Sequence, residues 1–414
     1  MKIIFTSLIS LVILVTNIPL FQKFTQRNLN NDNFFEIKYE ELLKQKSIIK
    51  LSQLASKIEY IQLETNENCM IYHNPKYYFT DKYIFVKNRD HILKFSSDGK
   101  FLKKIGSPGR GPGEIYIIHN VSIIPEKKLL IVHDQAPHKL LYFNFDGILI
   151  KTVKTPRFRE VRIINENRYI AISQVSGASE KYTHLLLTES GDTLSVVKNS
   201  VSWKTTSPIL VSKDSPSFEP FYTFQRKYYL KSMYNDTVYV VNENKIIPSY
   251  VINLGRYQLP SDKIWERLSP EEARRFEKNA SNYCFSYVFE AGGKLFLTID
   301  YWGDNNKVER FTIDKSGLIA KTDNKYSNVF KGYIDNDCDG GALFWPKGSI
   351  NDNTVFMPIY VADLKNIIKF RRTTNSLKSI VRFPDKRTQL EKMVSESDIS
   401  DNPILMVVTL KSDL

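Results

Sequence analysis

The chain has 414 residues and a formal net charge of +13, and 42% of its residues are hydrophobic and 13% aromatic. This apolar content is enough for a large buried core and excludes disorder as the dominant state. The lysines and arginines are spread along the whole chain, so we expect no nucleic-acid partner in spite of the basic charge. Its three cysteines (Cys69, Cys284 and Cys338) lack metal-site spacing and allow at most one disulfide.

The N-terminus carries Lys2 and then an apolar run from Ile3 to Phe21. A positive charge before an apolar run is typical of an export signal, although the run of roughly 18 to 19 residues approaches a minimal membrane span. We therefore predict that residues 1–21 form an export signal or an N-terminal membrane anchor. No lipobox is present, because the first cysteine is Cys69. The protein is expected in the periplasm or at the cell surface, with tethering by the N-terminal segment left open.

From about residue 58 onward the chain repeats one unit, an apolar-alternating strand, a short turn rich in Asp, Gly or Asn, and a second strand. Period-2 alternation on both sides of such a turn predicts a β-hairpin. Six copies lie at residues 91–106, 138–153, 183–197, 236–254, 308–322 and 367–383. A further apolar strand precedes each turn, at residues 83–88, 128–134, 168–174, 227–234, 294–301 and 354–361.

The spacing of these hairpins predicts the fold class. Successive turns are about 45 to 73 residues apart, and the shorter intervals match a four-stranded propeller blade. Arranging the sheets radially buries both apolar faces of each one. We predict an all-β fold, a six-bladed β-propeller with four-stranded blades over residues 51–412. The apolar strands 58–64 and 403–411 are suited to completing one blade jointly and closing the ring.

Short helices are expected outside the repeats. The longest interval contains an insertion at about 256–283, where Ser269, Pro270 and Glu272 supply a cap, a first-turn proline and an acid. These residues indicate one or two helices over about 262–280. Further helices are expected at 390–397, and at 37–45 within a linker that covers residues 22–50.

Five segments together make the chain similar to a known family, and they lie at residues 51–65, 94–115, 234–255, 336–346 and 401–411. The chain resembles the six-bladed, NHL-repeat-like β-propeller proteins common in Bacteroidota, which are mostly exported and have no assigned function. The similarity covers about residues 50–412 and implies the same fold. Most members look like lipoproteins, and this chain differs from them in lacking the anchoring cysteine.

The segment Ser107–Ile115 (SPGRGPGEI) is a candidate ligand loop. Its glycines let backbone N–H groups approach an anion, Arg110 offers a guanidinium fork, and Glu114 offers a carboxylate. The alternative is a tight crossing between blades in which Glu114 accepts backbone hydrogen bonds. Trp345 is a further candidate, either as a platform on which a sugar stacks or as a wedge in the core.

A second candidate site has the character of a calcium loop. Asp335, Asp337 and Asp339, followed by Gly340, match the first half of such a loop. The twelfth position is Pro346 instead of Glu, which excludes an EF-hand. Calcium bound in another geometry is kept as a hypothesis, and turn capping by these aspartates is the alternative.

Three histidines, His91, His138 and His184, each open a repeat hairpin. Their offsets from the turn glycines differ in parity, which places them on different sheet faces. A metal-binding ring of histidines is therefore not expected.

No Ser/His/Asp order, paired-acid signature or nucleophile elbow stands out in the sequence. The leading hypothesis is a non-catalytic, exported binding or scaffold module for a protein, peptide or glycan of the cell envelope. The alternative is a hydrolase or lyase that acts on a carbohydrate or lactone in the central channel, as other propellers do. Its first suspects would be Trp302, Asp300, Asp304 and the pair Asp337 and Asp339.

Overall fold

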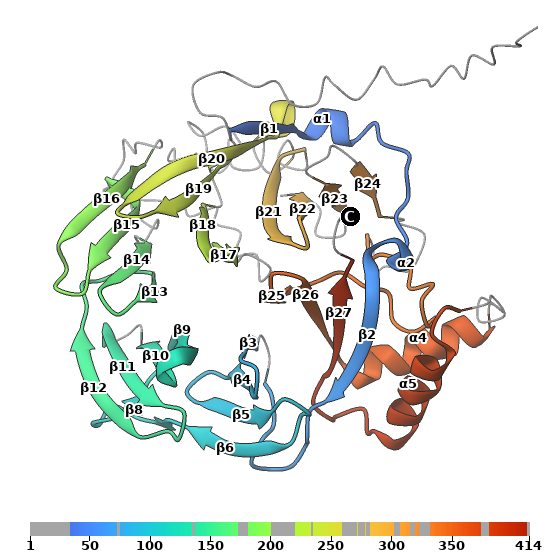
Figure 1. The fold of residues 1–414 in the computed structure, drawn as a ribbon, viewed down its shortest axis with the longest axis horizontal. Helices are drawn as coiled ribbons and strands as arrows, with labels where there is room; N and C mark the ends of the chain where they lie inside the picture. The colour runs from blue at the N-terminus through green and yellow to red at the C-terminus, as the bar shows by residue number, and fades with distance from the viewer. Residues whose placement is uncertain are drawn as a thin grey trace, which may run out of the picture.

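The structure is a computed structural model, and its described residues form six sheets arranged in a ring (Figure 1). These residues are 34–72, 75–134, 137–172, 181–199, 220–232, 235–258, 271, 278, 282–301, 307–314, 319–322, 332–373 and 381–411. The predicted six-bladed propeller is confirmed. The predicted export signal at residues 1–21 and most of the insertion at 256–283 lie outside the described residues.

Each of the first five blades is an antiparallel sheet of consecutive strands, and the first strand lies nearest the centre of the ring (Figure 1). The first blade comprises β3 (Lys76–Phe79), β4 (Tyr83–Lys87), β5 (Ile92–Ser96) and β6 (Phe101–Ile105). The second comprises β9 (Ile118–Ile124), β10 (Leu129–Asp134), β11 (Lys139–Asn144) and β12 (Leu149–Lys154). The third comprises β13 (Glu160–Asn165), β14 (Arg168–Ile172), β15 (Tyr182–Thr188) and β16 (Thr193–Lys198).

The fourth and fifth blades repeat this order. The fourth comprises β17 (Phe221–Phe224), β18 (Lys227–Lys231), β19 (Thr237–Asn242) and β20 (Lys245–Asn253). The fifth comprises β21 (Cys284–Ala291), β22 (Lys294–Tyr301), β23 (Val308–Asp314) and β24 (Ile319–Lys321). Five of the six predicted hairpins are therefore present, each as the third and fourth strands of a blade.

The sixth blade closes the ring. It comprises β25 (Gly348–Asn351), β26 (Thr354–Ile359), β27 (Ile404–Leu410) and, outermost, β2 (Ala55–Gln62). The strands β2 and β27 run antiparallel, with Ala55 opposite Leu410 and Gln62 opposite Ile404. The two ends of the propeller thus share one sheet, as the apolar strands at 58–64 and 403–411 predicted.

The sixth predicted hairpin, at residues 367–383, is wrong. Its first part belongs to helix α4 (Val361–Thr373), residues 374–380 lie outside the described residues, and its last part leads into helix α5 (Pro384–Glu396). Val361, Leu364 and Ile368 are buried at the three- and four-residue spacing of a helix. The hairpin also has no edge to join, because β27 and β2 already occupy the third and fourth positions of this blade.

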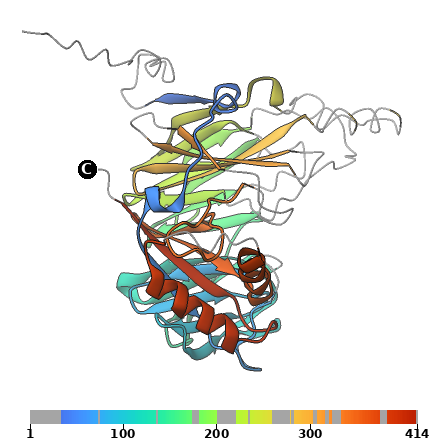
Figure 2. The same cartoon turned by 90° about the vertical axis from the view of Figure 1, so that its right-hand side faces the viewer.

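The two helices lie on the outside of the sixth blade, as the face-on and edge-on views agree (Figures 1 and 2). Helix α5 confirms the helix predicted at 390–397, ends one residue earlier at Glu396, and begins at Pro384, where a proline fits the first turn. No helix within the described ranges is long and apolar enough to cross a membrane.

The predicted linker over residues 22–50 is in part an element of the fold. Strand β1 (Phe35–Lys38) pairs in parallel with β20 and gives the fourth blade a fifth strand. A single helical turn follows, α1 (Tyr39–Leu42), inside the helix predicted at 37–45.

The chain then runs along the outside of the fifth blade to the sixth (Figure 1). Ile48 bridges Lys321 at the outer strand of the fifth blade, and Lys50 bridges Asp335. Helix α2 (Leu51–Leu54) leads directly into β2. We call residues 35–62 the N-terminal strap, because they join the outer rims of three blades.

The connections between strands divide the ring into two faces. In the first five blades, turns of two to four residues join the first strand to the second, and in the first four blades such turns also join the third strand to the fourth. Antiparallel strands alternate in direction, so all of these turns lie on one face, which we call the turn face. The remaining connections lie on the opposite face, the loop face, and include the segment 106–117 between the first two blades and 155–159 between the second and third. Two small pieces of strand, β7 (Ser107–Pro108) and β8 (Glu114–Ile115), and the 3-10 turns η2 (Pro125–Lys127) and η3 (Gly255–Tyr257) complete the described elements.

Hydrophobic clusters fill the spaces between neighbouring blades. Phe85 of the first blade and Val121 and Leu141 of the second belong to one such cluster. Another joins Phe95 of the first blade to Leu405 of the sixth. Each sheet is covered on both faces in this way, which explains why the central strands are almost continuously apolar.

Candidate functional site

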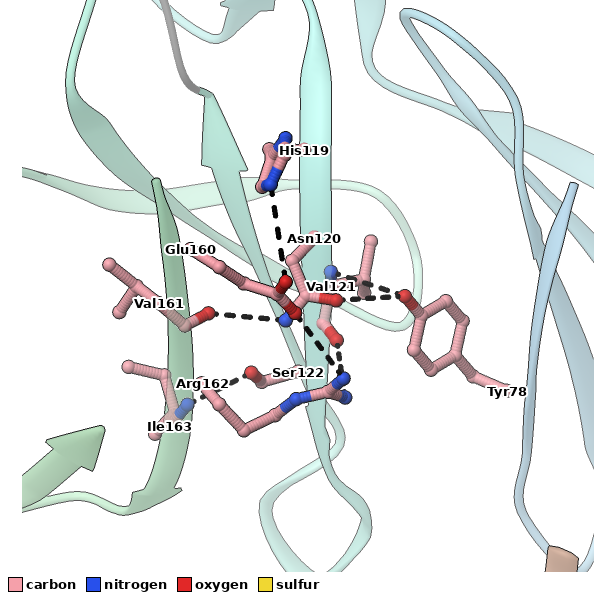
Figure 3. Close-up of polar contacts among 9 residues, drawn as sticks. All are labelled: Tyr78, His119, Asn120, Val121, Ser122, Glu160, Val161, Arg162 and Ile163. Atoms are coloured by element: carbon pink, nitrogen blue, oxygen red, sulfur yellow. Dashed lines mark hydrogen bonds and ion pairs between the residues drawn. The ribbon is translucent and has the colours of Figure 1, made fainter. Parts of the chain in front are cut away.

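The first strand of each blade is an edge strand that faces the centre of the ring, and its inward backbone groups lack a strand partner. In the first three blades, side chains from neighbouring inner strands bond to these groups (Figure 3). The contacts connect β3, β9 and β13. This cluster of polar side chains is the best-defined candidate site in the described part of the chain.

Tyr78 and Asn120 connect all three strands (Figure 3). The Tyr78 hydroxyl accepts a hydrogen bond from the backbone N–H of Val121 at 3.4 Å and donates to Asn120 Oδ1 at 3.2 Å. The other end of the same carboxamide, Asn120 Nδ2, donates to the carbonyl oxygen of Val161 at 3.1 Å. Asn120 is fully buried, so these bonds satisfy a polar side chain as well as two strand edges.

Two more side chains complete the connection between β9 and β13. Ser122 Oγ accepts a hydrogen bond from the Ile163 N–H at 3.0 Å. Arg162 Nη1 donates to the carbonyl oxygen of Val121 at 3.4 Å. We call Tyr78, Asn120, Ser122 and Arg162 the inner-strand belt. These side chains form hydrogen bonds with backbone groups that a neighbouring strand would pair in a continuous sheet.

A charged group lies at the end of the belt. Glu160, the first residue of β13, places Oε1 at 3.8 Å from Arg162 Nη2 and Oε2 at 4.0 Å from His119 Nε2. The side chain of Glu160 is 7% exposed and that of His119 is 27% exposed. The Arg162 guanidinium also lies 5.4 Å from the ring centroid of Phe221, so it reaches the fourth blade. The contacts orient Glu160 inward and leave His119 as the more accessible of the two.

Behind His119 lies a second histidine, His133, whose ring meets the His119 ring edge-on at 6.0 Å. Burial, together with the neighbouring His119 and His138, lowers the pKa of His133 to about 3. Neither ring nitrogen of His133 forms a hydrogen bond with any residue that the structure describes. His133 is therefore neutral at physiological pH, and it is held by packing.

The candidate loop Ser107–Ile115 joins the first blade to the second on the loop face. Strands β7 and β8 pair in parallel within it, and Glu114 Oε2 accepts a hydrogen bond from the Gly111 N–H at 2.7 Å. Gly109 has a φ of +151°, and a Cβ there would overlap the Glu114 carboxylate. Arg110 is exposed, with its guanidinium 4.7 Å from the ring centroid of Tyr116. The structure thus uses Glu114 inside the loop and presents Arg110 to solvent.

Trp345 lies in the core between the fifth and sixth blades. It is 3% exposed, its Nε1 donates to Thr298 Oγ1 at 3.1 Å, and its ring meets Phe296 edge-on at 5.7 Å. The surface therefore does not present this ring as a platform for a sugar.

The three aspartates of the candidate calcium loop bond to protein groups. Asp337 accepts hydrogen bonds from the N–H and the hydroxyl of Ser52, at 2.8 and 2.6 Å. Asp339 is fully buried and accepts from the Tyr60 hydroxyl at 2.7 Å, from Asn336 Nδ2 at 2.6 Å and from the Gly341 N–H at 2.7 Å. The carbonyl of Asp335 accepts from the Leu51 N–H at 2.9 Å.

These bonds tie the turn at 335–339 to the N-terminal strap. Across the described ranges, no group of three His, Cys, Asp or Glu residues is placed to hold a metal ion. The structure therefore does not bring Asp335, Asp337 and Asp339 together as ligands, and calcium binding stays a hypothesis without geometric support.

The remaining residues that the sequence singled out are dispersed. Trp302 and Asp304 lie outside the described residues, and Asp300 is on β22 opposite Phe285. His91 contacts Asp90 Oδ1 at 2.6 Å, and His184 is buried beside Thr183 in the third blade. His138 lies in the second blade, so the three repeat histidines belong to three different blades.

Sequence analysis did not identify the inner-strand belt or the group of His119 and Glu160. A signal existed in the basic stretch 151–162, where basic and apolar residues alternate as in a strand with one solvated face. In the structure this stretch comprises the end of β12, a link and the start of β13. Polar residues at alternate positions of an otherwise apolar first strand, as in β9, would have been the better signal.

The fold and the site together define a six-bladed β-propeller whose ring is closed by strands from both ends and whose inner strands are joined by polar side chains. The family of this propeller follows from its sequence. The chain belongs to the DUF4934 family, a domain of unknown function, whose model matches residues 34–409. The resemblance to an unassigned propeller family is thereby confirmed. No curated protein sequence is significantly similar to the chain.

Two solved structures are similar to the chain. A protein from Bacteroides fragilis that is inferred to be exported is 17% identical, with 91% of this chain and 99% of that chain covered and a TM-score of 0.66. A member of the DUF4221 family from Bacteroides vulgatus is 12% identical, with 89% and 100% covered and a TM-score of 0.46. Identities this low bear on the fold alone.

Proposed function

We propose that this protein is an exported, non-catalytic propeller that binds a protein, peptide or glycan of the cell envelope on its loop face. Export is supported by the N-terminal charge and apolar run, and by the structurally similar protein from Bacteroides fragilis that is inferred to be exported. The binding role is supported by exposed arginines on the loop face and by polar side chains in the centre that bond to the protein itself.

One observation carries the proposal. The loop face above the first two blades exposes arginine side chains, whereas the neighbouring carboxylates accept hydrogen bonds from the protein backbone. Arg89, Arg110 and Arg157 lie in three different loop-face connections and are exposed. The acids around them bond inward. Glu114 accepts from the Gly111 N–H, and Asp134 accepts from the N–H groups of Tyr116 and Ile117 at 3.1 and 3.0 Å. This surface therefore favours a partner with carboxylate groups.

The centre of the ring supports binding rather than chemistry. The described polar side chains there hold the inner strands together, and His133 is buried and neutral. These groups bond to the neighbouring inner strands, whereas a catalytic site needs polar groups directed at a substrate.

Affinity capture from a cell-envelope extract, combined with a glycan array, tests the proposal. We expect a partner that is retained by the wild-type protein and lost when Arg89, Arg110 and Arg157 are all replaced by serine. The matched control replaces Lys82, Lys100 and Lys245, three exposed cations of the turn face, with serine. Retention by the loop-face variant, or the absence of any partner in both assays, would contradict the proposal.

A further inference from the structure

A cavity of about 210 Å³ lies between the second and third blades, at their turn-face ends. Strands β9 to β12 of the second blade and β13 and β14 of the third form it together with their turns, on the side of the ring opposite to the loop face. The cavity is smaller than the pockets of about 300 Å³ and above that hold drug-sized ligands. Its size suits a single small ring.

The inner walls of the cavity are apolar and aromatic. Ile131 of β10 and Ile163 of β13 face each other across the two blades, and both are buried. Tyr142 of β11 and Tyr169 of β14 complete the walls, with exposed fractions of 8% and 6%. Burying a charged ligand against such walls would cost free energy, so the walls favour a neutral one.

The two tyrosine side chains are largely buried, but their hydroxyls are open to the cavity. Neither hydroxyl forms a hydrogen bond with a residue in the part of the chain that the structure describes, although both rings line the cavity. Burial, with contributions from Glu189 and Tyr169, raises the pKa of Tyr142 to about 12, so its hydroxyl is neutral and able to donate. Solvent reaches both hydroxyls in the cavity, so each is available to bond to water or to a bound molecule.

The rim carries two ion pairs, each of which joins the second blade to the third. Lys127 pairs with Glu166, and Lys151 Nζ lies 2.7 Å from Glu189 Oε1. Lys151 also lies over the Tyr142 ring, with Nζ 4.6 Å from the centroid. All four charged residues are about half exposed, and their charges cancel. Arg168 is the other charged residue of the lining, and its guanidinium donates to the Glu243 carbonyl oxygen and to Asn244 Oδ1. The rim thus offers several donors and acceptors, with one positive charge that is directed at neutral protein groups.

We propose that this cavity binds one neutral sugar ring, as the end or a side branch of a glycan. The C–H face of a sugar packs on Ile131, Ile163 and the tyrosine rings, and its hydroxyls supply the partners that Tyr142 and Tyr169 lack. The rim carboxylates and ammonium groups bond to the outward hydroxyls. The site is independent of the loop-face function, since it lies on the other face and uses none of the same residues.

Saturation-transfer NMR on the full chain tests the inference, with methyl glucoside, methyl galactoside, methyl mannoside and N-acetylglucosamine as probes. We expect at least one to bind in the millimolar range. Tyr142→Phe and Tyr169→Phe keep the rings and remove one hydroxyl each, so each should weaken binding about fivefold, the effect of one hydrogen bond. Tyr116→Phe, an exposed tyrosine of the loop face, is the matched control and should bind as the wild type does.

A rim variant and an apolar probe complete the experiment. Glu189→Gln changes an exposed rim residue, so the fold is retained, and it should also weaken binding. Cyclohexanol serves as an apolar probe of similar ring size. Absence of binding by all four sugars at tens of millimolar, equal binding by the wild type and both tyrosine variants, or tighter binding of cyclohexanol than of any sugar would overturn the inference.

Discussion

The hydroxyl of Tyr78 lies 3.2 Å from the carboxamide oxygen of Asn120, and this contact ties the first blade to the second at the centre of the ring. The same carboxamide reaches the third blade through its nitrogen. A single buried side chain thus bonds to groups of three blades whose described strands belong to separate sheets.

Replacing Asn120 with leucine should therefore destabilise the fold. The substitution keeps the approximate volume but removes the donor to the Val161 carbonyl and the acceptor for the Tyr78 hydroxyl, at a cost of about 2 kcal/mol in the free energy of unfolding. Urea denaturation measures this. Asn167→Ala, in an exposed turn, is the control and should change stability by no more than about 0.5 kcal/mol. Equal stability of the two variants would show that the belt contributes nothing.

Gly99 and Gly191 form a matched pair for testing ring closure. Both occupy corresponding turns with nearly equal φ, +94° and +95°, so an added side chain strains the backbone equally. A Cβ at Gly99 would overlap the Gln62 carbonyl oxygen of the sixth blade, whereas a Cβ at Gly191 meets nothing within 4 Å.

We expect Gly191→Ala to cost about 1 kcal/mol from the positive φ alone, and Gly99→Ala to cost clearly more. Thermal or urea unfolding of the two variants gives the comparison. A smaller loss for Gly99→Ala than for Gly191→Ala would contradict the close approach of the first and sixth blades.

Two buried histidines predict sensitivity to acid. Burial lowers the pKa of His133 to about 3 and that of His184 to about 4. In the unfolded chain both titrate near 6.5, so below this pH the unfolded state binds more protons and the native state loses stability as pH falls. The loss continues until the folded pKa values are reached, and at pH 5 it amounts to about 2 kcal/mol for each histidine.

His133→Phe should remove the His133 share of this effect. Between pH 7 and pH 5 the free energy of unfolding of the variant should fall by about 2 kcal/mol less than that of the wild type. The phenyl ring also needs no hydrogen-bond partners, so the variant should not be less stable than the wild type at pH 5. Urea denaturation at the two pH values checks this, and an unchanged difference between them would show that His133 is not the titrating group.

Asp339 should contribute to the stability of the fold, because it accepts a hydrogen bond from Tyr60 of the N-terminal strap. Asp339→Asn replaces one acceptor oxygen by an NH₂ group and sets donor against donor at Tyr60, Asn336 or Gly341, which should cost about 2 kcal/mol or more. The exposed Asp81→Asn is the control. Because protein donors already bond these carboxylates, we expect calcium to leave the melting temperature of the wild type unchanged. A rise with calcium that Asp337→Asn abolishes would contradict this expectation and favour the calcium hypothesis.

Period-2 patterns and turn residues predicted what is local in the fold. Five hairpins follow from them because each strand pairs with its neighbour in sequence, and the closing strands followed from their apolar character. Helix α4 was missed because alternating basic and apolar residues over 365–378 fit a strand as well as a helix over a short window. The sixth blade is complete without this segment, because β27 and β2 supply its third and fourth strands, and only the tertiary structure shows this.

The site could be predicted less well, for a related reason. Tyr78, Asn120 and Val161 are about 40 residues apart in sequence, and their contact depends on the packing of three blades. The series Asp335, Asp337 and Asp339 has the local pattern of a calcium loop, but its donors include Ser52 and Tyr60, which come from the other end of the propeller. A local pattern identifies the polar groups without identifying what bonds to them.

The N-terminal strap also constrains the order in which the protein can be assembled. Residues 35–62 are synthesised before every strand that they pair with, namely β20, β24 at Lys321, and β27. During translation β1 can pair with β20 only after residue 253 has left the ribosome, and β2 can pair with β27 only after residue 410 has done so. The strap therefore acquires its partners in chain order, from the fourth blade to the sixth, and the ring closes only at the end of synthesis.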